Sequence, residues 1–252
     1  MNCSIPNELL EALRSARFVV ALTGAGVSAE SGIPTFREPM DGWWARFRPE
    51  DLATPEAFAR DPATVTRWYE WRRQLCAKAK PNPAHRALVE LERRCRRVSL
   101  ITQNVDRLHQ AAGSQNVVEL HGTLWEWRCV RCGQQREERQ PLRDFPPLCS
   151  CGGLRRPAVV WFGEALPEAA LTRAYQDAAA CDVFFSIGTS AVVWPAAELA
   201  HVARQHGARL VEINVRPTPL TSLADWVLTG RAGEVLPALV AALQPPDREQ
   251  PF

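Results

Sequence analysis

Residues 18–32, FVVALTGAGVSAESG, join an apolar run to a glycine-rich turn. The run is typical of a buried parallel strand, and the residues after the turn can begin a helix. Gly24, Gly26 and Ala29 fit the dinucleotide-binding pattern G-x-G-x-x-(G/A). In that pattern the first glycine permits the tight turn, the second lets the backbone approach a pyrophosphate, and the small residue allows close helix–strand packing. The stretch therefore predicts a phosphate-binding strand–turn–helix unit.

A hydride-transferring dehydrogenase of this kind carries Asp or Glu about 20 residues after the glycines, at the end of the second strand. Here the next convincing strand begins near Val98. Residues 34–81 lie between and are rich in aromatic residues, proline and arginine, which predicts short helices joined by turns. The missing carboxylate argues against a dehydrogenase, although a dinucleotide is still the expected ligand.

Strand-like and helix-like segments alternate along the chain. We expect helices over 7–16, 82–95, 196–207 and 232–243, and strands over 17–24, 96–106, 181–190, 209–217 and 225–230. This order predicts an α/β fold, a Rossmann-like doubly wound parallel sheet with a smaller inserted domain. Ligands of such sheets bind at the carboxyl ends of the strands. Polar and turn-forming residues follow four of the strands, at 24–26, 102–104, 188–190 and Asn214.

The composition excludes several classes of protein. The chain has 252 residues, enough for one large domain or a domain with an insertion, and its formal net charge of +2 gives no argument for nucleic acid or a membrane as partner. No secretory signal and no apolar run of about 20 residues is present in the sequence. We therefore expect a cytoplasmic protein with reduced thiols.

Four of the eight cysteines form two close pairs, Cys129-x-x-Cys132 and Cys149-x-Cys151. Four thiolates in this arrangement suit tetrahedral zinc, and a full set of protein ligands implies a structural site. Four unrelated buried thiols are one alternative. A redox C-x-x-C is another, but it should begin a helix beside a strand, which this segment does not suggest. The remaining cysteines have no partner at a useful spacing: Cys3, Cys76, Cys95 and Cys181.

Taken together, the motifs resemble those of the sirtuins, which are NAD-dependent protein lysine deacylases. The matching segments occur in the family's order: GAGVSAESGIPTFR (24–37), TQNVDRLHQAAG (102–113), ELHG (119–122), the cysteine quartet, PAVVWFGE (157–164), SIGTS (186–190) and EINVRP (212–217). The resemblance implies a single catalytic domain over 1–252. Its Rossmann-like part is expected at about 1–36, 81–122 and 158–245, a helical module at 37–80, a zinc module at 123–157, and a disordered tail at 246–252.

The resemblance also implies roles for individual residues. His121 matches the family's general base. The implied NAD-binding residues are Gly24, Ala25, Gly26, Ser28, Glu30, Phe36, Arg37, Gln103, Asn104, Val105, Asp106, Gly188, Thr189, Ser190, Asn214, Val215 and Ala232. Val160, Trp161, Phe162 and Gly163 match the strand that pairs with the substrate peptide backbone. No chemistry is assigned to His85, His109, His201 and His206, which are expected to be helix residues.

In the mechanism that the resemblance implies, nicotinamide leaves NAD and the acyl-lysine carbonyl oxygen attacks C1′ of the ribose, giving an alkylimidate. An imidazole that titrates near neutrality then accepts a proton from a ribose hydroxyl, which attacks the intermediate. Nicotinamide and O-acyl-ADP-ribose are released. NAD is consumed, one structural zinc is expected, and the partners are acyl-lysine proteins or peptides bound by a monomer.

Tyr69 and Arg72 lie three residues apart in RWYEWRRQL (67–75), hence on one helix face. They resemble the Tyr-x-x-Arg pair of class III sirtuins, which favour succinyl- and malonyl-lysine. Arg72 would pair with the distal carboxylate and Tyr69 would add a hydrogen bond, with acetyl also accepted. Alternatively both side chains lie exposed on an arginine-rich helix, and Arg73 is the competing reader of the carboxylate if the helix is rotated.

Three other functions stay open: a plain deacetylase, an ADP-ribosyltransferase that modifies protein side chains, and a non-catalytic NAD-binding module. The Tyr69–Arg72 pair and the matched His121 argue against the second. The joint presence of Gln103, Asn104, Asp106 and His121 argues against the third.

Overall fold

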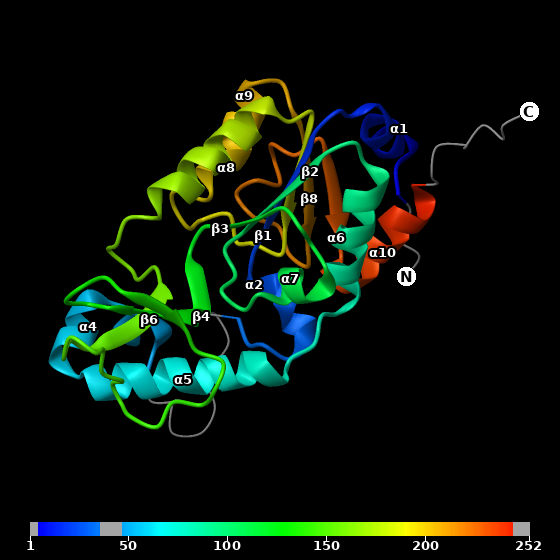
Figure 1. Cartoon of the computed structure of the whole chain (residues 1–252). Coiled ribbons are helices and arrows are strands. Elements are labelled where there is room, and N and C mark those ends of the chain that lie inside the picture. Colours follow the sequence, from blue (N-terminus) through cyan, green and yellow to red (C-terminus); the bar gives the residue numbers. More distant parts are fainter. Residues whose placement is uncertain (1–4, 36–46, 244–252) are drawn as a thin grey trace, which may run out of the picture.

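The computed structural model describes residues 5–35 and 47–243. Phe36, Arg37, Cys3 and the tail predicted at 246–252 lie outside the described residues. The described chain forms two sheets, one of six parallel strands and one of three antiparallel strands (Figure 1). The predicted α/β class and Rossmann-like parallel sheet are confirmed.

The large sheet has the strand order β3-β2-β1-β7-β8-β9. Its bounds are β1 Val19–Thr23, β2 Val98–Thr102, β3 Val117–Glu119, β7 Val183–Ile187, β8 Arg209–Asn214 and β9 Trp226–Thr229. Every residue of β1, β2 and β7 is buried, as expected for central parallel strands that helices cover on both faces. The strand order reverses beside β1, so the glycine turn that follows β1 lies where such sheets bind their ligands.

Helices cover both faces of this sheet (Figure 1). On one face α1 (Asn7–Ser15), α6 (Pro83–Arg94) and α10 (Ala232–Ala242) pack against alternate strand residues such as Val19 and Phe185. On the other face α8 (Glu168–Ala180) and α9 (Glu198–Gln205) pack against the intervening residues such as Val20 and Phe184. The alternation follows from the strand period of two residues.

The second sheet has the order β5-β4-β6, with β4 Gly122–Cys129, β5 Gln135–Glu137 and β6 Arg155–Val159. It packs with α3 (Pro49–Leu52), α4 (Pro55–Arg60) and α5 (Pro62–Lys78) around a third apolar core that contains Trp68, Tyr69, Trp127 and Trp161. The small sheet and these helices lie beside the large sheet, at the lower left of Figure 1.

Polar caps followed by proline start three of the helices. Thr54 accepts a hydrogen bond from the Ala57 amide at the start of α4, and Asp61 accepts one from the Thr64 amide at the start of α5. Asn82 and His85 form a capping box at the start of α6. Each cap accepts a hydrogen bond from an amide that has no partner inside the helix. Proline at the first helical position costs no backbone hydrogen bond, because an amide there would have no partner inside the helix.

Besides the three strands of the small sheet, three elements were not predicted from the sequence: α7 (Leu108–Ala112), β3 and α8. The buried residues of α8 are Ala174, Asp177 and Ala178, so its inner face lacks the large apolar side chains that mark an amphipathic helix. Two further short elements, α2 (Ala25–Ser28) and η1 (Ala29–Ser31), follow β1. Across 5–35 and 47–243, no helix is both long and apolar enough to cross a bilayer.

Candidate functional site

The carboxyl ends of four parallel strands meet at one edge of the large sheet. The Gly24 amide donates to the Ile187 carbonyl oxygen (3.0 Å), and the Gly188 amide donates to the Ile213 carbonyl oxygen (2.9 Å). Asn214 donates its side-chain amide to the Thr189 carbonyl oxygen (2.7 Å). The four polar segments that the sequence places after strands therefore lie in one place.

The glycines of this edge are needed for contact between the turns themselves. A Cβ on Gly24 or Gly26 would lie 2.8 Å from the Gly188 carbonyl oxygen, and a Cβ on Gly188 would lie 2.7 Å from the Val27 nitrogen. The Gly26 amide also donates to the Gly188 carbonyl oxygen (2.9 Å). The sequence interpretation gave Gly26 the role of admitting a pyrophosphate. The structure adds a second reason for glycine here, since Gly188 lies where a Cβ on Gly26 would be and one turn packs directly against the other.

A buried polar cluster lies directly behind the glycine turn. The Asn104 side-chain amide donates to the Gly24 carbonyl oxygen and to Ser28 Oγ, both at 3.1 Å. Ser28 Oγ in turn donates to Asp106 Oδ2 (2.7 Å), and the Leu108 amide donates to Asp106 Oδ1 (2.8 Å). Burial raises the pKa of the Asp106 carboxyl, and these hydrogen bonds oppose the rise. The cluster holds three of the residues predicted to bind the cofactor in one rigid unit.

Two histidines belong to the same cluster, and the sequence interpretation missed them. The rings of His85 and His109 lie 4.8 Å apart, and His109 Nε2 lies 3.0 Å from Thr23 Oγ1 at the end of β1. Burial lowers the pKa of His85 to about 4 and that of His109 to about 3, so both are neutral at pH 7. One signal was visible: His85 stands three residues before Leu88 on the apolar face of α6, where a histidine is necessarily buried.

His121 follows β3 and lies half-buried at the edge of the site. Its Nδ1 atom lies 3.0 Å from the Gln103 carbonyl oxygen, which can only accept a hydrogen bond. Nδ1 therefore carries the proton, and Nε2 keeps a free lone pair. Burial lowers the pKa of His121 below its ordinary value of 6.5, and the hydrogen bond to Gln103 opposes this. The ring is thus a neutral imidazole that can accept a proton at neutral pH.

Tyr69 and Arg72 lie on α5; Tyr69 belongs to the third core, and Arg72 is half-buried and close enough to Asp106 of the polar cluster to interact with its charge. Tyr69 is only 1% exposed, so the alternative that places it on the surface is wrong. Its ring lies nearly parallel to that of Trp161, with 6.2 Å between the centroids, and the Arg72 guanidinium lies 5.0 Å from the centroid of the Trp68 ring. Burial raises the pKa of Tyr69 and lowers that of Arg72, while Tyr69 and Asp106 favour the charged guanidinium.

Arg73, the competing reader of the carboxylate, is excluded by its own contacts. Its guanidinium forms a two-pronged ion pair with Glu70, Nε to Oε2 at 2.9 Å and Nη2 to Oε1 at 3.0 Å, with both side chains 3% exposed. It also donates to the carbonyl oxygens of Glu138 and Gln140. Arg73 thus joins α5 to the strand-rich part of the chain, and four of its five N–H donors and its charge are already taken up within the protein.

The segment 160–163, predicted as the strand that receives the peptide, is not a strand in the structure. β6 ends at Val159. The Val160 amide donates to the His121 carbonyl oxygen (3.0 Å), and the Phe162 amide donates to the Ala53 carbonyl oxygen (2.9 Å). The Trp161 amide donates to Glu164 Oε2 (2.9 Å), which bends the chain into a turn. Because these amides are occupied, an added strand would use the carbonyl oxygens and the Gly163 amide.

The other predicted NAD-binding residues fall into two groups. Val105 belongs to the third core, Thr189 accepts a hydrogen bond from the Gln103 side chain (3.0 Å), and Ala25, Ser190 and Val215 flank the strand ends. Glu30 instead accepts a hydrogen bond from the Gly233 amide (2.8 Å) at the start of α10, next to Ala232. Its carboxylate caps that helix, which accounts for Glu30 without a cofactor.

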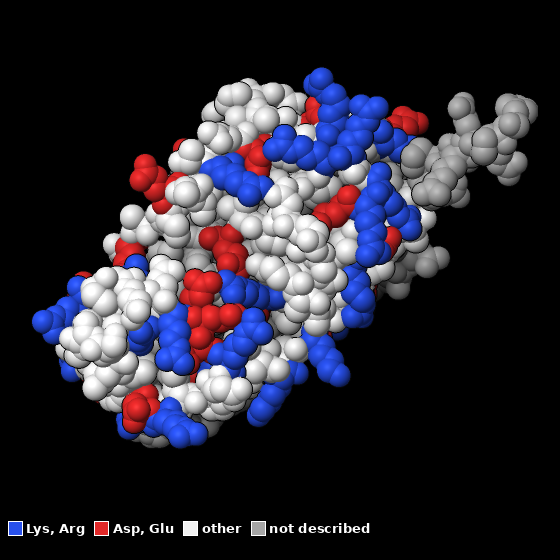
Figure 2. All heavy atoms as spheres, in the orientation of Figure 1, with Lys and Arg blue, Asp and Glu red and all other residues white. Residues whose placement is uncertain are grey.

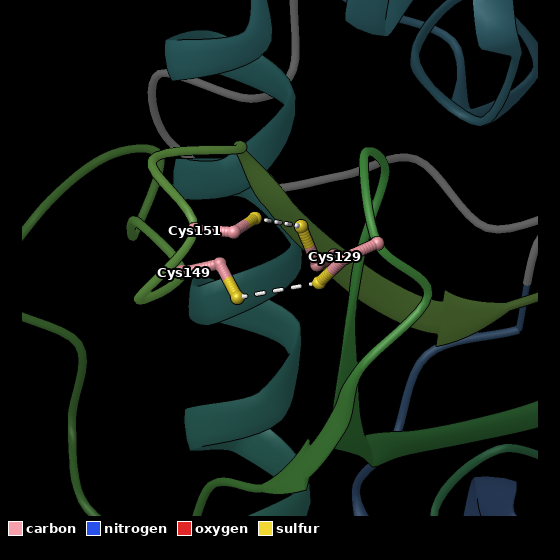
Figure 3. A group of neighbouring side chains, drawn as sticks. Cys129, Cys149 and Cys151 are labelled. Atoms are coloured by element: carbon pink, nitrogen blue, oxygen red, sulfur yellow. Dashed lines mark hydrogen bonds between the residues drawn. The ribbon is translucent and has the colours of Figure 1, made fainter.

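The cysteine quartet forms a compact sulfur cluster between the end of β4 and the loop before β6 (Figure 3). The ligand atoms of Cys129, Cys132, Cys149 and Cys151 all lie within 4.8 Å of one another, with 3.5 Å between the Cys129 and Cys151 sulfurs and 3.7 Å between those of Cys132 and Cys149. Tetrahedral zinc with bonds of about 2.3 Å places its sulfurs about 3.8 Å apart. The cluster therefore fits zinc and supplies all four ligands. In the described chain no other group of this kind occurs.

The other described cysteines are buried singly. Burial raises the pKa of Cys76 to about 12, that of Cys95 to about 11 and that of Cys181 to about 12. Thiols held protonated in this way are poor nucleophiles, so they act as core residues, in line with the prediction.

Comparison with known proteins gives four matches that bear on the site. Residues 24–195 match the model of the Sir2 family. The chain is 56% identical over 229 residues to NAD-dependent protein deacylase 2 of Pyrobaculum aerophilum, covering 90% of this chain and 92% of that protein.

Two solved structures share the fold over almost the whole chain. A mutant Sir2 homologue in complex with 2′-O-acetyl ADP ribose superposes with a TM-score of 0.90 at 50% identity, covering 95% of this chain and 96% of the other. A Sir2 complex with a p53 peptide and NAD+ superposes with a TM-score of 0.86 at 35% identity, covering 95% and 98%.

Proposed function

The chain belongs to the Sir2 family and is an NAD-dependent protein deacylase, and we propose that it prefers acidic acyl groups, succinyl and malonyl, over acetyl. One observation carries the assignment of the site. A neutral imidazole, His121, presents a free Nε2 beside the cluster that joins the glycine turn to Asn104, Ser28 and Asp106. The similarity to a protein deacylase and to a complex with an acetylated ADP-ribose agrees with this chemistry.

We propose that NAD binds along the carboxyl edge of the large sheet. Its nicotinamide end would lie against Gln103, Asn104 and Asp106, and its adenosine end against Gly188, Thr189 and Asn214. Bound there, NAD supplies an electrophilic ribose carbon once nicotinamide departs. The interlocked turns around Gly24, Gly26 and Gly188 hold the edge in place before binding, so little ordering is needed when the cofactor arrives.

His121 is proposed to accept the proton of a ribose hydroxyl at Nε2. The Gln103 carbonyl oxygen fixes the tautomer by holding the proton on Nδ1. The Val160 amide, which donates to the His121 carbonyl oxygen, couples the backbone of this histidine to the segment proposed to bind the peptide. General-base residues of this type accelerate reactions by about 10²- to 10⁴-fold.

Arg72 supports the preference for acidic acyl groups. Its guanidinium lies among aromatic side chains and beside Tyr69, in a setting where burial disfavours the charge. A carboxylate that enters such a site gains a charge-assisted hydrogen bond in low dielectric, which is worth more than the same contact in water. An acetyl group has no distal carboxylate and therefore cannot form this hydrogen bond with Arg72. We propose that Tyr69 and Arg72 together read the distal carboxylate.

The zinc site has a structural role, since four cysteines fill the coordination of the metal and leave no position for water or substrate.

The chain binds acyl-lysine peptides, in line with the solved Sir2 complex with a p53 peptide. We propose that the peptide lies along residues 160–163, and that the chain divides at the boundaries expected from the sequence. The monomeric state, the cytoplasmic location and the absence of a nucleic-acid partner stay predictions.

The test compares removal of succinyl and acetyl groups from matched peptides by the wild type, Arg72→Met and Arg67→Met. Arg67 is an exposed arginine on the same helix and controls for loss of one positive charge. We expect Arg72→Met to lower kcat/KM for the succinyl peptide by about 10²-fold, the equivalent of a charge-assisted contact, and to leave the acetyl reaction within about threefold. Equal loss on both peptides would contradict the acyl preference but not the deacylase assignment.

A further inference from the structure

Arg155 and Arg156 are adjacent residues of β6 and both are buried, at 6% and 5% exposure. They point to opposite sides of the strand and have different partners. Arg156 forms a two-pronged ion pair with Glu164, with Nη2 and Oε2 2.9 Å apart. Arg155 has no carboxylate within ion-pair distance anywhere in 5–35 and 47–243. A buried guanidinium without a counter-charge is costly, so its compensation has to come from another group.

That group is the sulfur cluster. Arg155 Nη2 lies 3.5 Å from Cys149 Sγ and donates to Gln134 Oε1 at 2.8 Å, and the Arg155 backbone amide donates to the Pro147 carbonyl oxygen. The loop that carries Cys149 is therefore tied to this arginine at two points. A second arginine touches the cluster from the solvent side: the Arg131 amide lies 3.4 Å from Cys129 Sγ, and its side chain donates to the Cys151 carbonyl oxygen.

Zinc held by four thiolates carries a net charge of about −2, and this charge sits beside Arg155. An ionised Cys149 can only accept hydrogen bonds, which makes Arg155 its matching donor. We propose that Arg155 is the buried counter-ion of the zinc tetrathiolate and that its main effect is to slow the loss of zinc. The inference rests on the zinc site described above and does not depend on the preferred acyl group. Arg155 is a positioning residue for the metal centre and touches no substrate.

The direct readout is the release of zinc from the folded chain. Zinc content is measured first, followed by the rate of transfer to an excess of the chromogenic chelator 4-(2-pyridylazo)resorcinol. The variants are Arg155→Met, Arg155→Lys and, as control, Arg143→Met, which removes an exposed arginine from the same loop region. We expect release to be at least about tenfold faster in Arg155→Met, the size of effect common for groups that support metal ligands, and unchanged in Arg143→Met.

A spectroscopic measurement separates this role from a general loss of stability. In the cobalt-substituted protein, the thiolate-to-metal charge-transfer band reports the electron density on sulfur. Loss of a cationic donor to Cys149 raises that density, so the band should move to lower energy in Arg155→Met and stay in place in Arg143→Met. A purely structural Arg155 would leave the band unmoved.

Three outcomes decide the proposal. A wild type without stoichiometric zinc would overturn the zinc site itself and this inference with it, while leaving the deacylase assignment standing. Zinc release and band position in Arg155→Met equal to those of Arg143→Met would overturn the role of Arg155 alone. If Arg155→Met does not fold, a further variant, Arg155→Gln, decides, because its amide keeps hydrogen-bond donors but removes the charge. Release at least about threefold faster than in Arg143→Met is expected, and an equal rate contradicts the proposal. Arg155→Lys keeps the charge, so its release should be slower than that of Arg155→Gln.

Discussion

The Nδ1 atom of His121 lies 3.0 Å from the backbone carbonyl oxygen of Gln103. This contact joins the second residue after β3 to the residue that directly follows β2, so neighbouring strand ends set both the position and the tautomer of the imidazole. Because a backbone carbonyl moves only with its strand, the geometry is fixed by the sheet and does not depend on a mobile side chain.

Replacing His121 by Gln should abolish deacylation while leaving nicotinamide release in place. The imidazole is needed for the proton transfer that follows departure of nicotinamide, so its loss should reduce lysine formation by about 10²- to 10⁴-fold. The measurement compares lysine formation with exchange of labelled nicotinamide into NAD. His206→Gln is the matched control, because the Nδ1 of this exposed histidine also bonds a backbone carbonyl, that of Val202. Loss of both reactions in His121→Gln would contradict the assigned role.

The fall in kcat/KM on acidification (the acid limb of the pH profile) should be centred below pH 6.5. Burial holds the pKa of His121 below that ordinary value, so the base is neutral and active down to this pH and becomes protonated only on further acidification. The pH profile of kcat/KM for an acetyl-lysine peptide, whose own charge does not change in this range, measures the limb. An acid limb centred above pH 7 would show that His121 is not the titrating base.

Acidification should destabilise the fold through His85 and His109. Their pKa values, about 4 and about 3 in the folded chain, lie below the value of 6.5 expected after unfolding. Between pH 6.5 and about 4 the unfolded chain therefore binds more protons, and the free energy of unfolding falls as the pH falls. The check is urea unfolding from pH 7.5 to 4.5 in the wild type and His109→Gln, with exposed His201→Gln as control. His109→Gln should show the smaller slope with pH; an unchanged slope would refute the contribution of His109.

Gly188→Ala should disrupt both stability and NAD binding. The new Cβ would lie 2.7 Å from the Val27 nitrogen, at a residue whose φ is +58°. Overpacking and left-handed backbone strain together predict a loss of about 3 kcal/mol in the free energy of unfolding. Gly207→Ala is the control, because Gly207 also has a positive φ but no atom within 4 Å of the added Cβ, so only about 1 kcal/mol is expected. Calorimetric titration with NAD should show weakened binding in Gly188→Ala alone.

Arg107 should stabilise the contact between the two sheets, and it should do so less at high salt concentration. It lies in the left-handed region (φ 59°) just before α7, and its guanidinium contacts Glu119 of β3, Glu126 of β4 and Glu137 of β5. Acidic and basic side chains are interleaved on the face that carries β3 and β4 (Figure 2). Because these pairs are partly exposed, Arg107→Ala should cost about 1 kcal/mol at low salt and less at 1 M salt. Arg139→Ala, which removes a more exposed partner of Glu137, should change little at either salt concentration.

Much of the fold could be predicted from the sequence because its signals are local. Apolar runs ending at Gly24, Asn104, Gly188 and Asn214 identify parallel strands by length and composition alone. The helix α8 could not be found in this way, since it packs through Ala174 and Ala178, whose small side chains give little periodic contrast.

The site was predicted less completely because several of its contacts join distant residues. Nothing in the sequence shows that His85 and His109 meet, since the two histidines come from separate segments and both lie far along the chain from Thr23 and Ser28. The choice between Arg72 and Arg73, by contrast, could have been made from the sequence. Glu70 stands three residues before Arg73, and this spacing already indicates the ion pair that occupies Arg73 in the structure.

The most direct test of the account is a product analysis by mass spectrometry, with a succinyl-lysine peptide, NAD and the wild-type enzyme. We expect equal amounts of unmodified lysine peptide, nicotinamide and O-succinyl-ADP-ribose, with no product when NAD is left out. Peptide or enzyme bearing ADP-ribose, or nicotinamide released while the peptide stays acylated, would contradict it.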